Sequence, residues 1–274
     1  MSSKPFIKWA GGKYKLAKHL FSFLPTDISD LNYLEPMIGG GGMFFYLKPN
    51  NAYLSDINPK LINTYNCIKK DVNSVINFLR DFENQHYINE EFYSIQRDRF
   101  NFDELSDIEM AALFIYLNKT CFNGLYRENS KGEFNVPKGR ASSGKATICD
   151  KENLLNCSKL FKNINFGCHS YENIFSQVNS ESFVYLDPPY IPLKQDSFTK
   201  YAKDDFSVKM HYDLKDFCNK LNELDAKFML SNSDTSKTRE IYEGFNINEI
   251  LVNRSIGSTS KTRKKAAELI ITNY

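Results

Sequence analysis

A carboxylate, two prolines and an aromatic ring follow one another at the end of an apolar run in FVYLDPPYIPL, residues 183–193. The run Phe183–Asp187 predicts a buried strand. Two prolines after such a strand are costly, because each lacks a backbone N–H donor and has a fixed φ. Since Asp187 precedes a proline, its backbone is held extended rather than helical. The segment therefore presents a carboxylate and a backbone carbonyl side by side, next to a flat ring.

These groups suit an amine carried on a planar base. Asp187 and the carbonyl of Pro188 can each accept one N–H bond, and Tyr190 offers a face for stacking. The exocyclic amine of adenine is a poor nucleophile, because its lone pair is delocalised into the ring. Accepting both N–H bonds draws the nitrogen toward sp3 geometry and frees that lone pair. The alternative is a plain strand end, since the sequence DPP also occurs in ordinary loops.

A glycine run in YLEPMIGGGG, residues 33–42, is a second candidate site. The strand predicted at Tyr33–Glu35 leads into four glycines, whose backbone can approach a ligand closely because it has no Cβ atoms. A helix predicted at Met43–Leu47 would offer free N–H groups to a polar or anionic group. The run departs from the GxGxxG pattern, which argues against a dinucleotide pyrophosphate.

An acidic residue at the end of the next predicted strand, Ala52–Asp56, completes a cofactor pattern. Asp56 lies 17 residues after Gly39, where doubly wound folds bind ribose hydroxyls. The alternative is that Asp56 caps a helix beginning near Pro59. Together with the glycine run, Asp56 indicates a nucleoside cofactor without a pyrophosphate, and S-adenosylmethionine fits that description.

Composition excludes several other classes of protein. The chain has 274 residues, of which 42 % are hydrophobic and 25 % charged, as expected of a globular protein. Its six cysteines form no CxxC pair and its four histidines have no ligand spacing, so we expect free thiols and no metal site. It contains no apolar run of membrane-spanning length and no signal-peptide core, which predicts a cytoplasmic protein.

Basic residues are clustered along the chain, although the net charge is only +2. Residues 1–26 contain five lysines and no acid, and residues 251–267 contain five basic residues and no acid. Basic residues also outnumber acids at 119–145, whereas acids gather at 81–109. The basic segments could form one face for a polyanion. Ordinary solvated surface is the alternative for each segment alone.

Strand and helix patterns alternate at both ends of the chain, which predicts an α/β fold with a mostly parallel sheet covered on both faces. Residues 71–119 show only helical periodicity, and a turn-rich stretch follows, which predicts a hairpin or long loop. The predicted strands are Tyr33–Glu35, Ala52–Asp56, Asn163–Cys168, Phe183–Asp187, Phe228–Ser231, Ile247–Asn253 and Glu268–Thr272. The predicted helices include Lys13–Leu24, Pro59–Lys69, Val72–Phe82, Asn89–Arg99, Asp107–Leu117 and Asp205–Glu223.

Six motifs in a fixed order resemble the Dam-type DNA adenine-N6 methyltransferases, which include solitary enzymes and those of GATC restriction–modification systems. The resemblance extends from about residue 6 to the C-terminus. The motifs are FIKWAGGK (6–13), YLEPMIGGGG (33–42), LSDIN (54–58), NGLYRENSKGEFNVPKGR (123–140), YLDPPY (185–190) and LSN (230–232).

The resemblance implies a Rossmann-like doubly wound methyltransferase sheet with an inserted helical DNA-recognition domain and a β-hairpin. Residues 1–58 and 143–274 would form the catalytic domain, and 59–142 the recognition domain, with the hairpin at about 118–140. The cofactor residues would be Trp9, Lys13, Gly39, Asp56 and Asp187, and the catalytic residues Asp187, Pro188 and Tyr190. The DNA-binding residues would be Lys8, Phe122, Asn123, Leu125, Arg127, Pro137 and Arg140.

The implied activity is methyl transfer from S-adenosylmethionine to N6 of a flipped adenine, in GATC, by a monomer that binds double-stranded DNA without a metal. The family often has tyrosine at Phe122 and sometimes an aromatic residue at Lys138. Trp9 could instead be a core residue, Leu125 a packing residue, and Arg140 a nonspecific phosphate contact. Other possible functions are methylation of cytosine N4 or of a glutamine side chain, and DNA binding by an inactive relative.

Overall fold

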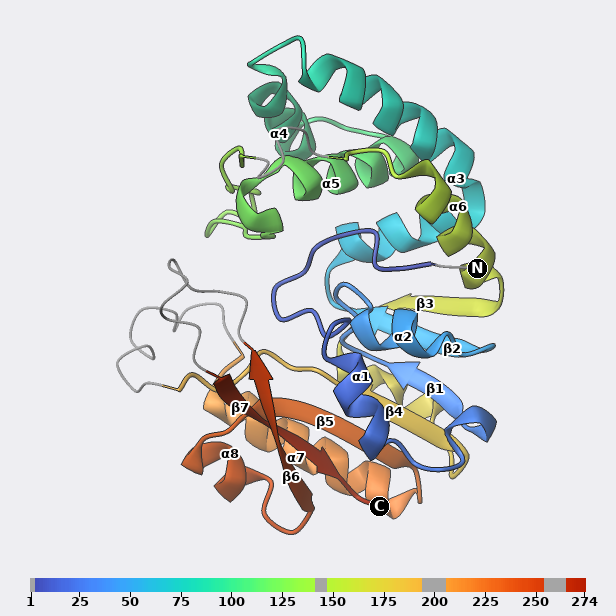
Figure 1. Ribbon diagram of the computed structural model, residues 1–274, viewed down its shortest axis with the longest axis vertical. Coiled ribbons are helices and arrows are strands. Elements are labelled where there is room, and N and C mark those ends of the chain that lie inside the picture. Colours follow the sequence, from blue (N-terminus) through green and yellow to red (C-terminus); the bar gives the residue numbers. More distant parts are fainter. Residues whose placement is uncertain (1–2, 141–146, 194–205, 254–264) are drawn as a thin grey trace. The chain divides into compact units, whose positions relative to one another are not determined.

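The computed structural model describes residues 3–140, 147–193, 206–253 and 265–274 (Figure 1). Seven strands in these residues form one sheet with the order β3-β2-β1-β4-β5-β7-β6. The α/β class predicted from the sequence is therefore confirmed. The strands are β1 (Asn32–Glu35), β2 (Ala52–Asp56), β3 (Ile164–Cys168), β4 (Ser182–Leu186), β5 (Lys227–Ser233), β6 (Asn246–Asn253) and β7 (Lys265–Thr272).

Contacts along the chain divide it into two compact units, which are described separately. The first unit comprises Met1–Tyr14, Ile38–Asn50 and Leu54–His169, and the second comprises Lys15–Met37, Asn51–Tyr53 and Ser170–Tyr274. The boundaries expected near residues 58 and 142 separate a catalytic domain from a DNA-recognition domain. A division by contacts does not test that separation, so it stays a prediction.

The second unit contains both parallel and antiparallel strands. Strand β4 pairs in parallel with β1 and β5, whereas β7 pairs antiparallel with β5 and β6. The parallel pairing expected from the sequence therefore extends only as far as β5. Strands β6 and β7 are joined by only 11 residues, 254–264, and a parallel crossover requires about a dozen or more. A short connection favours the antiparallel pair.

Helices α7 (Val208–Glu223) and α8 (Ser236–Ile241) belong to the same unit (Figure 1). The apolar face of α7, with Leu214 and Phe217, packs in one buried cluster with Val184 of β4 and Leu230 of β5. This packing fixes the ends of β4 and β5, where the DPPY sequence and the LSN sequence lie. The predicted start of this helix, Asp205, lies outside the described residues.

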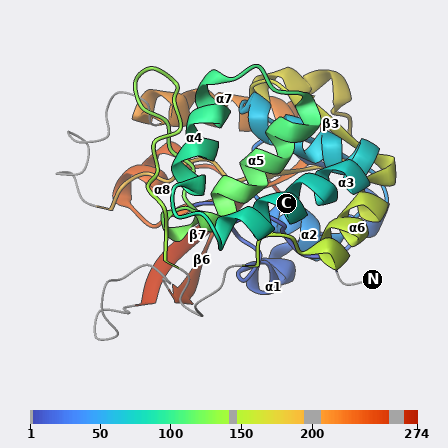
Figure 2. The ribbon, with the colours of Figure 1, turned by 90° about the horizontal axis from the view of Figure 1, so that it is seen from above.

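The first unit is mainly helical. Its longer helices are α3 (Pro59–His86), α4 (Phe92–Phe102), α5 (Asp107–Thr120) and α6 (Lys151–Leu160), and α3 runs beside α5 (Figures 1 and 2). The two helices expected at Pro59–Lys69 and Val72–Phe82 form the two parts of α3. They meet at Asp71, which is non-helical with φ −149°. Its carboxylate accepts the Ser74 N–H at 3.1 Å, as a cap does at a new helical start.

The helix expected at Lys13–Leu24 is much shorter than predicted. Only α1 (Ala17–Leu20) is α-helical, and a 3-10 turn follows at Phe21–Phe23. Gly11 has φ +75° and Gly12 donates to the Trp9 carbonyl in a tight turn. These two glycines shape the turn before Lys13, and the backbone of Lys13 and Tyr14 then packs closely against Gly42 instead of beginning a helix. Among the described residues, no helix is both long and apolar enough to cross a membrane.

Candidate active site and nucleic-acid interface

Asp187 stands immediately after β4, and a relay of hydroxyl groups holds its carboxylate. Ser231 of β5 donates its hydroxyl hydrogen to Asp187 Oδ1 at 2.8 Å. The Tyr185 hydroxyl lies 3.2 Å from the same serine oxygen. A serine has one hydroxyl hydrogen, so Tyr185 must be the donor in this second bond. The relay from Tyr185 through Ser231 therefore fixes the orientation of the Asp187 carboxylate.

Three phenols, two buried and one half-buried, lie near this carboxylate. Burial raises the pKa of Tyr185 well above its usual value, and the negative charge of Asp187 adds to the effect. Burial likewise raises the pKa of Tyr190, with further contributions from Asp187 and Glu268. Tyr33 has a raised pKa for the same first reason and donates to Glu35 at 2.7 Å. All three phenols therefore stay protonated and act as hydrogen-bond donors.

The backbone of the DPPY loop, residues 187–191, is fixed from β5. Asn232 Oδ1 accepts the Ile191 N–H at 3.1 Å, and the Ser233 hydroxyl donates to the Ile191 carbonyl. Pro188 is buried and Pro189 is exposed. Three consecutive residues, Ser231 to Ser233, thus hold both ends of the loop. Their role was not assigned from sequence, although LSN stood out as a motif.

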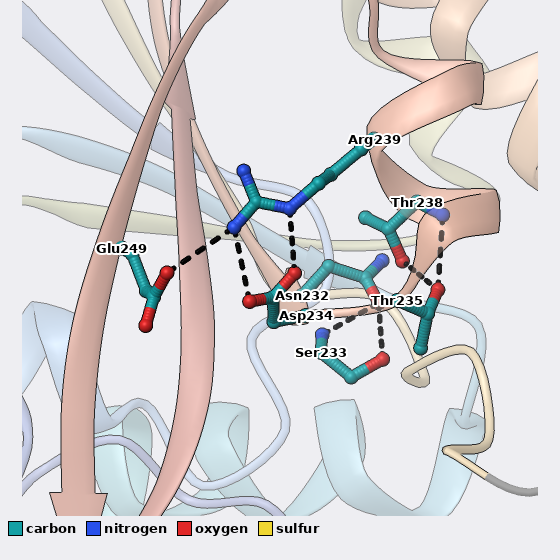
Figure 3. A network of polar contacts seen from close by, with 7 residues as sticks. All are labelled: Asn232, Ser233, Asp234, Thr235, Thr238, Arg239 and Glu249. Carbon is teal, nitrogen blue, oxygen red and sulfur yellow. Dashed lines mark hydrogen bonds and ion pairs between the residues drawn. The ribbon is translucent and has the colours of Figure 1, made fainter.

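The end of β5 is anchored in turn (Figure 3). Asp234 follows Ser233 and accepts two bonds from the guanidinium of Arg239 on α8, at 2.7 and 2.9 Å. The same guanidinium lies 3.3 Å from Glu249 of β6. This fork of bonds stabilises the chain directly beyond the residues that hold the DPPY loop.

The glycine run in the first unit receives the N-terminal segment of the chain. A Cβ atom on Gly39 would lie 2.6 Å from the Trp9 ring, and one on Gly40 would lie 2.9 Å from Trp9 Cβ. At Gly42, an added Cβ would lie 2.8 Å from the backbone nitrogen of Lys13. The glycines are therefore required because the N-terminal segment packs against them. The sequence analysis had expected them to make room for a ligand and did not foresee this packing.

Asp56 connects the glycine run to the start of α3. Its Oδ2 accepts the Gly39 N–H and its Oδ1 accepts the Asn58 N–H, both at 3.0 Å. Burial raises the pKa of Asp56, although these backbone donors oppose the shift. The cap of α3 is Asn58, whose side chain accepts the Leu61 N–H. The alternative of Asp56 as the cap is therefore wrong.

Lys13 is buried, and its Nζ donates to the Gly11 carbonyl at 2.6 Å. Trp9 is half-buried, and Ile57, next to Asp56, has 73 % of its side chain exposed. An apolar side chain this open directly beside Asp56 is a candidate site residue that the sequence analysis did not name. The sequence signal for Ile57 was its position directly after an acid at the end of a predicted strand.

The turn-rich segment after α5 forms a loop closed at its base, called here the bridged loop, residues 121–138. Cys121 and Lys138 form an antiparallel bridge, and the Phe122 N–H donates to the Pro137 carbonyl at 2.9 Å. Glu128 and Phe134 form a second bridge farther out. The segment thus folds back on itself through isolated bridges rather than through two regular strands.

The expected DNA-binding residues gather at this loop and its neighbours. Asn123 has φ +56°, a left-handed conformation that asparagine tolerates. Leu125 is half-buried, consistent with a packing contribution. The exposed members of the predicted set are Lys8, Phe122, Asn123, Arg127, Pro137 and Arg140. All of these residues belong to the first unit.

Arg127 and Lys8 are held in defined places. Arg127 Nε donates to Asn135 Oδ1 across the bridged loop at 2.7 Å. The backbone of Lys8 exchanges two hydrogen bonds with the Asn118 side chain, each 2.8 Å, and Asn118 also donates to the Gly124 carbonyl at 3.2 Å. Asn118 thereby joins the N-terminal segment to the loop. The basic residues Arg254, Lys261, Arg263 and Lys264 lie outside the described residues.

An acid at the end of one parallel strand, and a second acid bonded to a glycine run after another strand, are features of doubly wound α/β proteins that bind nucleotides at the carboxyl ends of their strands. A family model described as D12 class N6 adenine-specific DNA methyltransferase matches residues 9–256. The chain belongs to this family and is an adenine-specific DNA methyltransferase.

Curated relatives agree over the whole length. A type II methyltransferase of Methanocaldococcus jannaschii, M.MjaIII, is 42 % identical and covers 100 % of both chains. The DNA adenine methylases of Haemophilus influenzae and Escherichia coli K12 are each 34 % identical, covering 98 % of this chain and 93 % and 94 % of theirs. These matches support adenine over the cytosine and glutamine amines, and an enzyme over an inactive relative. A solved methylase from Haemophilus influenzae aligns at 10 % identity with a TM-score of 0.31, covering 94 % of this chain and 88 % of its own.

Proposed function

We propose that this enzyme transfers the methyl group of S-adenosylmethionine to N6 of an adenine flipped out of a GATC site in duplex DNA. The observation that carries the proposal is the Asp187 carboxylate, held directly after a buried parallel strand by Ser231 at 2.8 Å. An acceptor fixed before the substrate arrives stabilises charge without reorganisation.

The reaction follows from the groups in the DPPY loop. Asp187 and the Pro188 carbonyl accept the two N–H bonds of the target amine, and the Tyr190 ring supports the base by stacking. S-adenosylmethionine supplies an electrophilic methyl carbon on a positively charged sulfur. The bound cofactor would supply that carbon as the methyl group and keep the electron pair of the broken carbon–sulfur bond, while Asp187 and Pro188 would direct the N6 lone pair toward it. The N6 proton then leaves by way of the Asp187 carboxylate or water.

The first unit contains a set of residues that fits such a cofactor. The Asp56 carboxylate can accept from ribose hydroxyls with lone pairs beyond the two used by the backbone. The exposed Ile57 gives an apolar surface beside it, and Trp9 and Lys13 complete the expected set. The departure from GxGxxG supports a nucleoside ligand without a pyrophosphate.

Sequence recognition is assigned to residues 59–142, with the bridged loop entering the major groove. Arg127 is exposed and carries a guanidinium fork that matches the O6/N7 edge of guanine. Lys8, Phe122, Asn123, Leu125, Pro137 and Arg140 are the further contacts proposed. Extruding one nucleotide requires a firm hold on the duplex around it. The exposed basic side chains at and near the loop suit that task.

The experiment is methyl transfer from S-adenosylmethionine to duplexes containing GATC or each of its single-base variants. Nucleoside analysis by mass spectrometry should find N6-methyladenine, with the GATC duplex methylated fastest. Methyl groups on another atom would contradict the role of Asp187 proposed here. Equal rates on all duplexes would contradict the GATC assignment while leaving the chemistry intact.

A further inference from the structure

Glu268 is a carboxylate in the middle of strand β7, between Ala267 and Leu269. The following residues, Leu269, Ile270 and Ile271, are completely buried, whereas Glu268 is half-buried. In the antiparallel register with β5, Glu268 lies opposite Ser233. A partly buried carboxylate in such a strand loses contact with water, so it must be compensated by hydrogen-bond donors from the protein.

The partner of Glu268 is a residue of the DPPY loop. The Tyr190 hydroxyl donates to Glu268 Oε2 at 2.9 Å. Among the described residues, Glu268 takes part in no ion pair. Its identified contact is with a phenol of the active site.

This contact completes the restraint of the Tyr190 ring. Its backbone lies between Pro189, whose φ is fixed, and Ile191, whose N–H and carbonyl are both bonded to β5. The far end of the ring is held by Glu268. With its backbone and its hydroxyl both held, the direction of the ring axis is fixed, and because the phenolic O–H lies in the ring plane, the bond to Glu268 also favours one ring plane. A base that stacks on the ring then meets a surface of defined orientation.

We propose that Glu268 is a positioning residue for methyl transfer, whose carboxylate holds the Tyr190 ring in the place where the target adenine stacks. The inference rests on the proposed function of Tyr190 as the stacking face. It goes beyond that function by placing one determinant of ring orientation on β7, 78 residues away in sequence.

Three single substitutions and one double substitution test the inference. Glu268→Ala removes the acceptor, Tyr190→Phe removes only the donor, and Glu268→Gln retains an acceptor oxygen without the charge. A charge-assisted hydrogen bond contributes enough that its loss should lower kcat roughly tenfold in Glu268→Ala and in Tyr190→Phe. Glu268→Gln should retain most of the activity. KM for the duplex should stay within about twofold throughout, because ring orientation, not DNA binding, is affected.

The double variant separates positioning from simple charge. In Tyr190→Phe/Glu268→Ala the second change should add nothing to the first, because the hydrogen bond is already lost. If the two effects multiply instead, Glu268 acts through its charge and the inference is wrong. A normal kcat in Glu268→Ala would also contradict it. Should Glu268→Ala fail to fold, the two other single variants decide. A roughly tenfold lower kcat in Tyr190→Phe with most activity retained in Glu268→Gln supports the inference, and a normal kcat in Tyr190→Phe contradicts it.

A fluorescent base reports on the ring directly. A duplex with 2-aminopurine at the target position should brighten on flipping and be quenched when the base stacks on Tyr190. Weaker quenching is expected in Glu268→Ala than in the parent. Glu240→Ala is the matched control, because Glu240 also accepts a tyrosine hydroxyl, that of Tyr212 at 3.0 Å, but the pair is exposed on the surface. A parent enzyme without activity on GATC would contradict the proposed function itself, whereas an active parent with silent Glu268 variants contradicts only this inference.

Discussion

The indole ring of Trp9 stacks on the phenol ring of Tyr126, with centroids 5.7 Å apart and ring planes 20° from parallel. Phe114 of α5 stacks against both rings, at 6.4 Å from Trp9 and 5.2 Å from Tyr126. Since Trp9 also covers Gly39 and Gly40, one side chain joins the glycine run to the bridged loop. The segment proposed to bind the cofactor and the loop proposed to bind DNA are thus in physical contact through Trp9.

Replacing Tyr126 with leucine should loosen the bridged loop. Aromatic pairs contribute about 0.5–1.5 kcal/mol beyond their buried area, so cognate DNA binding should weaken by roughly that amount. Trp9 is the only tryptophan in the chain, and its emission should change in the free protein. Tyr87→Leu is the control, since Tyr87 contacts His86. Unchanged emission in Tyr126→Leu would show that the stack is not formed in solution.

Gly39→Ala should destabilise the first unit strongly. Gly39 has φ +45°, and an added Cβ would lie 2.6 Å from the Trp9 ring. Backbone strain of about 1 kcal/mol and overpacking of about 1–3 kcal/mol should add. Gly132→Ala is the matched control, with φ +76° and nothing within 4 Å of the added atom. Denaturant unfolding followed by Trp9 emission should give a clearly larger loss for Gly39→Ala. Equal losses would mean that Trp9 moves aside without cost.

His211 should make stability depend on pH. It is 1 % exposed on α7, and burial lowers its pKa from 6.5 to about 4, although the Pro189 carbonyl opposes the shift. Between these values the unfolded chain binds more protons than the folded one, so stability falls as pH falls through this range. The contribution of His211 should decrease by about 2 kcal/mol from pH 7 to pH 5.

The measurement for His211 is urea unfolding at both pH values in the parent and in His211→Gln, with the exposed His19→Gln as control. The parent should lose about 2 kcal/mol more than His211→Gln over this range. If the free energy of unfolding falls equally in parent and variant, His211 can be protonated in the folded protein without cost.

Arg127→Ala should relax specificity rather than abolish activity. Loss of a bidentate contact to guanine should cost about 1–3 kcal/mol on GATC and reduce discrimination at one guanine position. Lys131→Ala is the comparison, since Lys131 is an exposed residue of the same loop and a phosphate contact should affect all sequences equally. Rates on GATC and on each single-base variant measure the difference. An even loss across all duplexes in Arg127→Ala would assign it to the phosphate backbone.

Sequence patterns predicted the strands well, because strand ends coincide with strong local signals. Strand β2 has the predicted bounds, and Asp56 and Asp187 stand at strand ends as expected. The cap of α3 was a local signal, since Asn58 accepts the Leu61 N–H three residues on, and the sequence analysis overlooked it in favour of Asp56. That the glycines receive Trp9 could not be seen locally, because it depends on how distant segments pack. Glu268 was not foreseen for the same reason, since its partner Tyr190 lies in another part of the chain.

The orientation of the Asp187 carboxylate is the central feature of this account, and its test is the rate of methyl transfer by Asp187→Asn under single-turnover conditions. The substitution keeps the shape of the side chain but turns a donor toward the Ser231 hydroxyl or toward the target amine. A single preorganised acceptor contributes on the order of 10²–10³ in rate, so the rate should fall by at least that factor while duplex affinity is retained. A near-normal rate in Asp187→Asn would contradict the account, because the carboxylate would then not be the acceptor of the N6 amine.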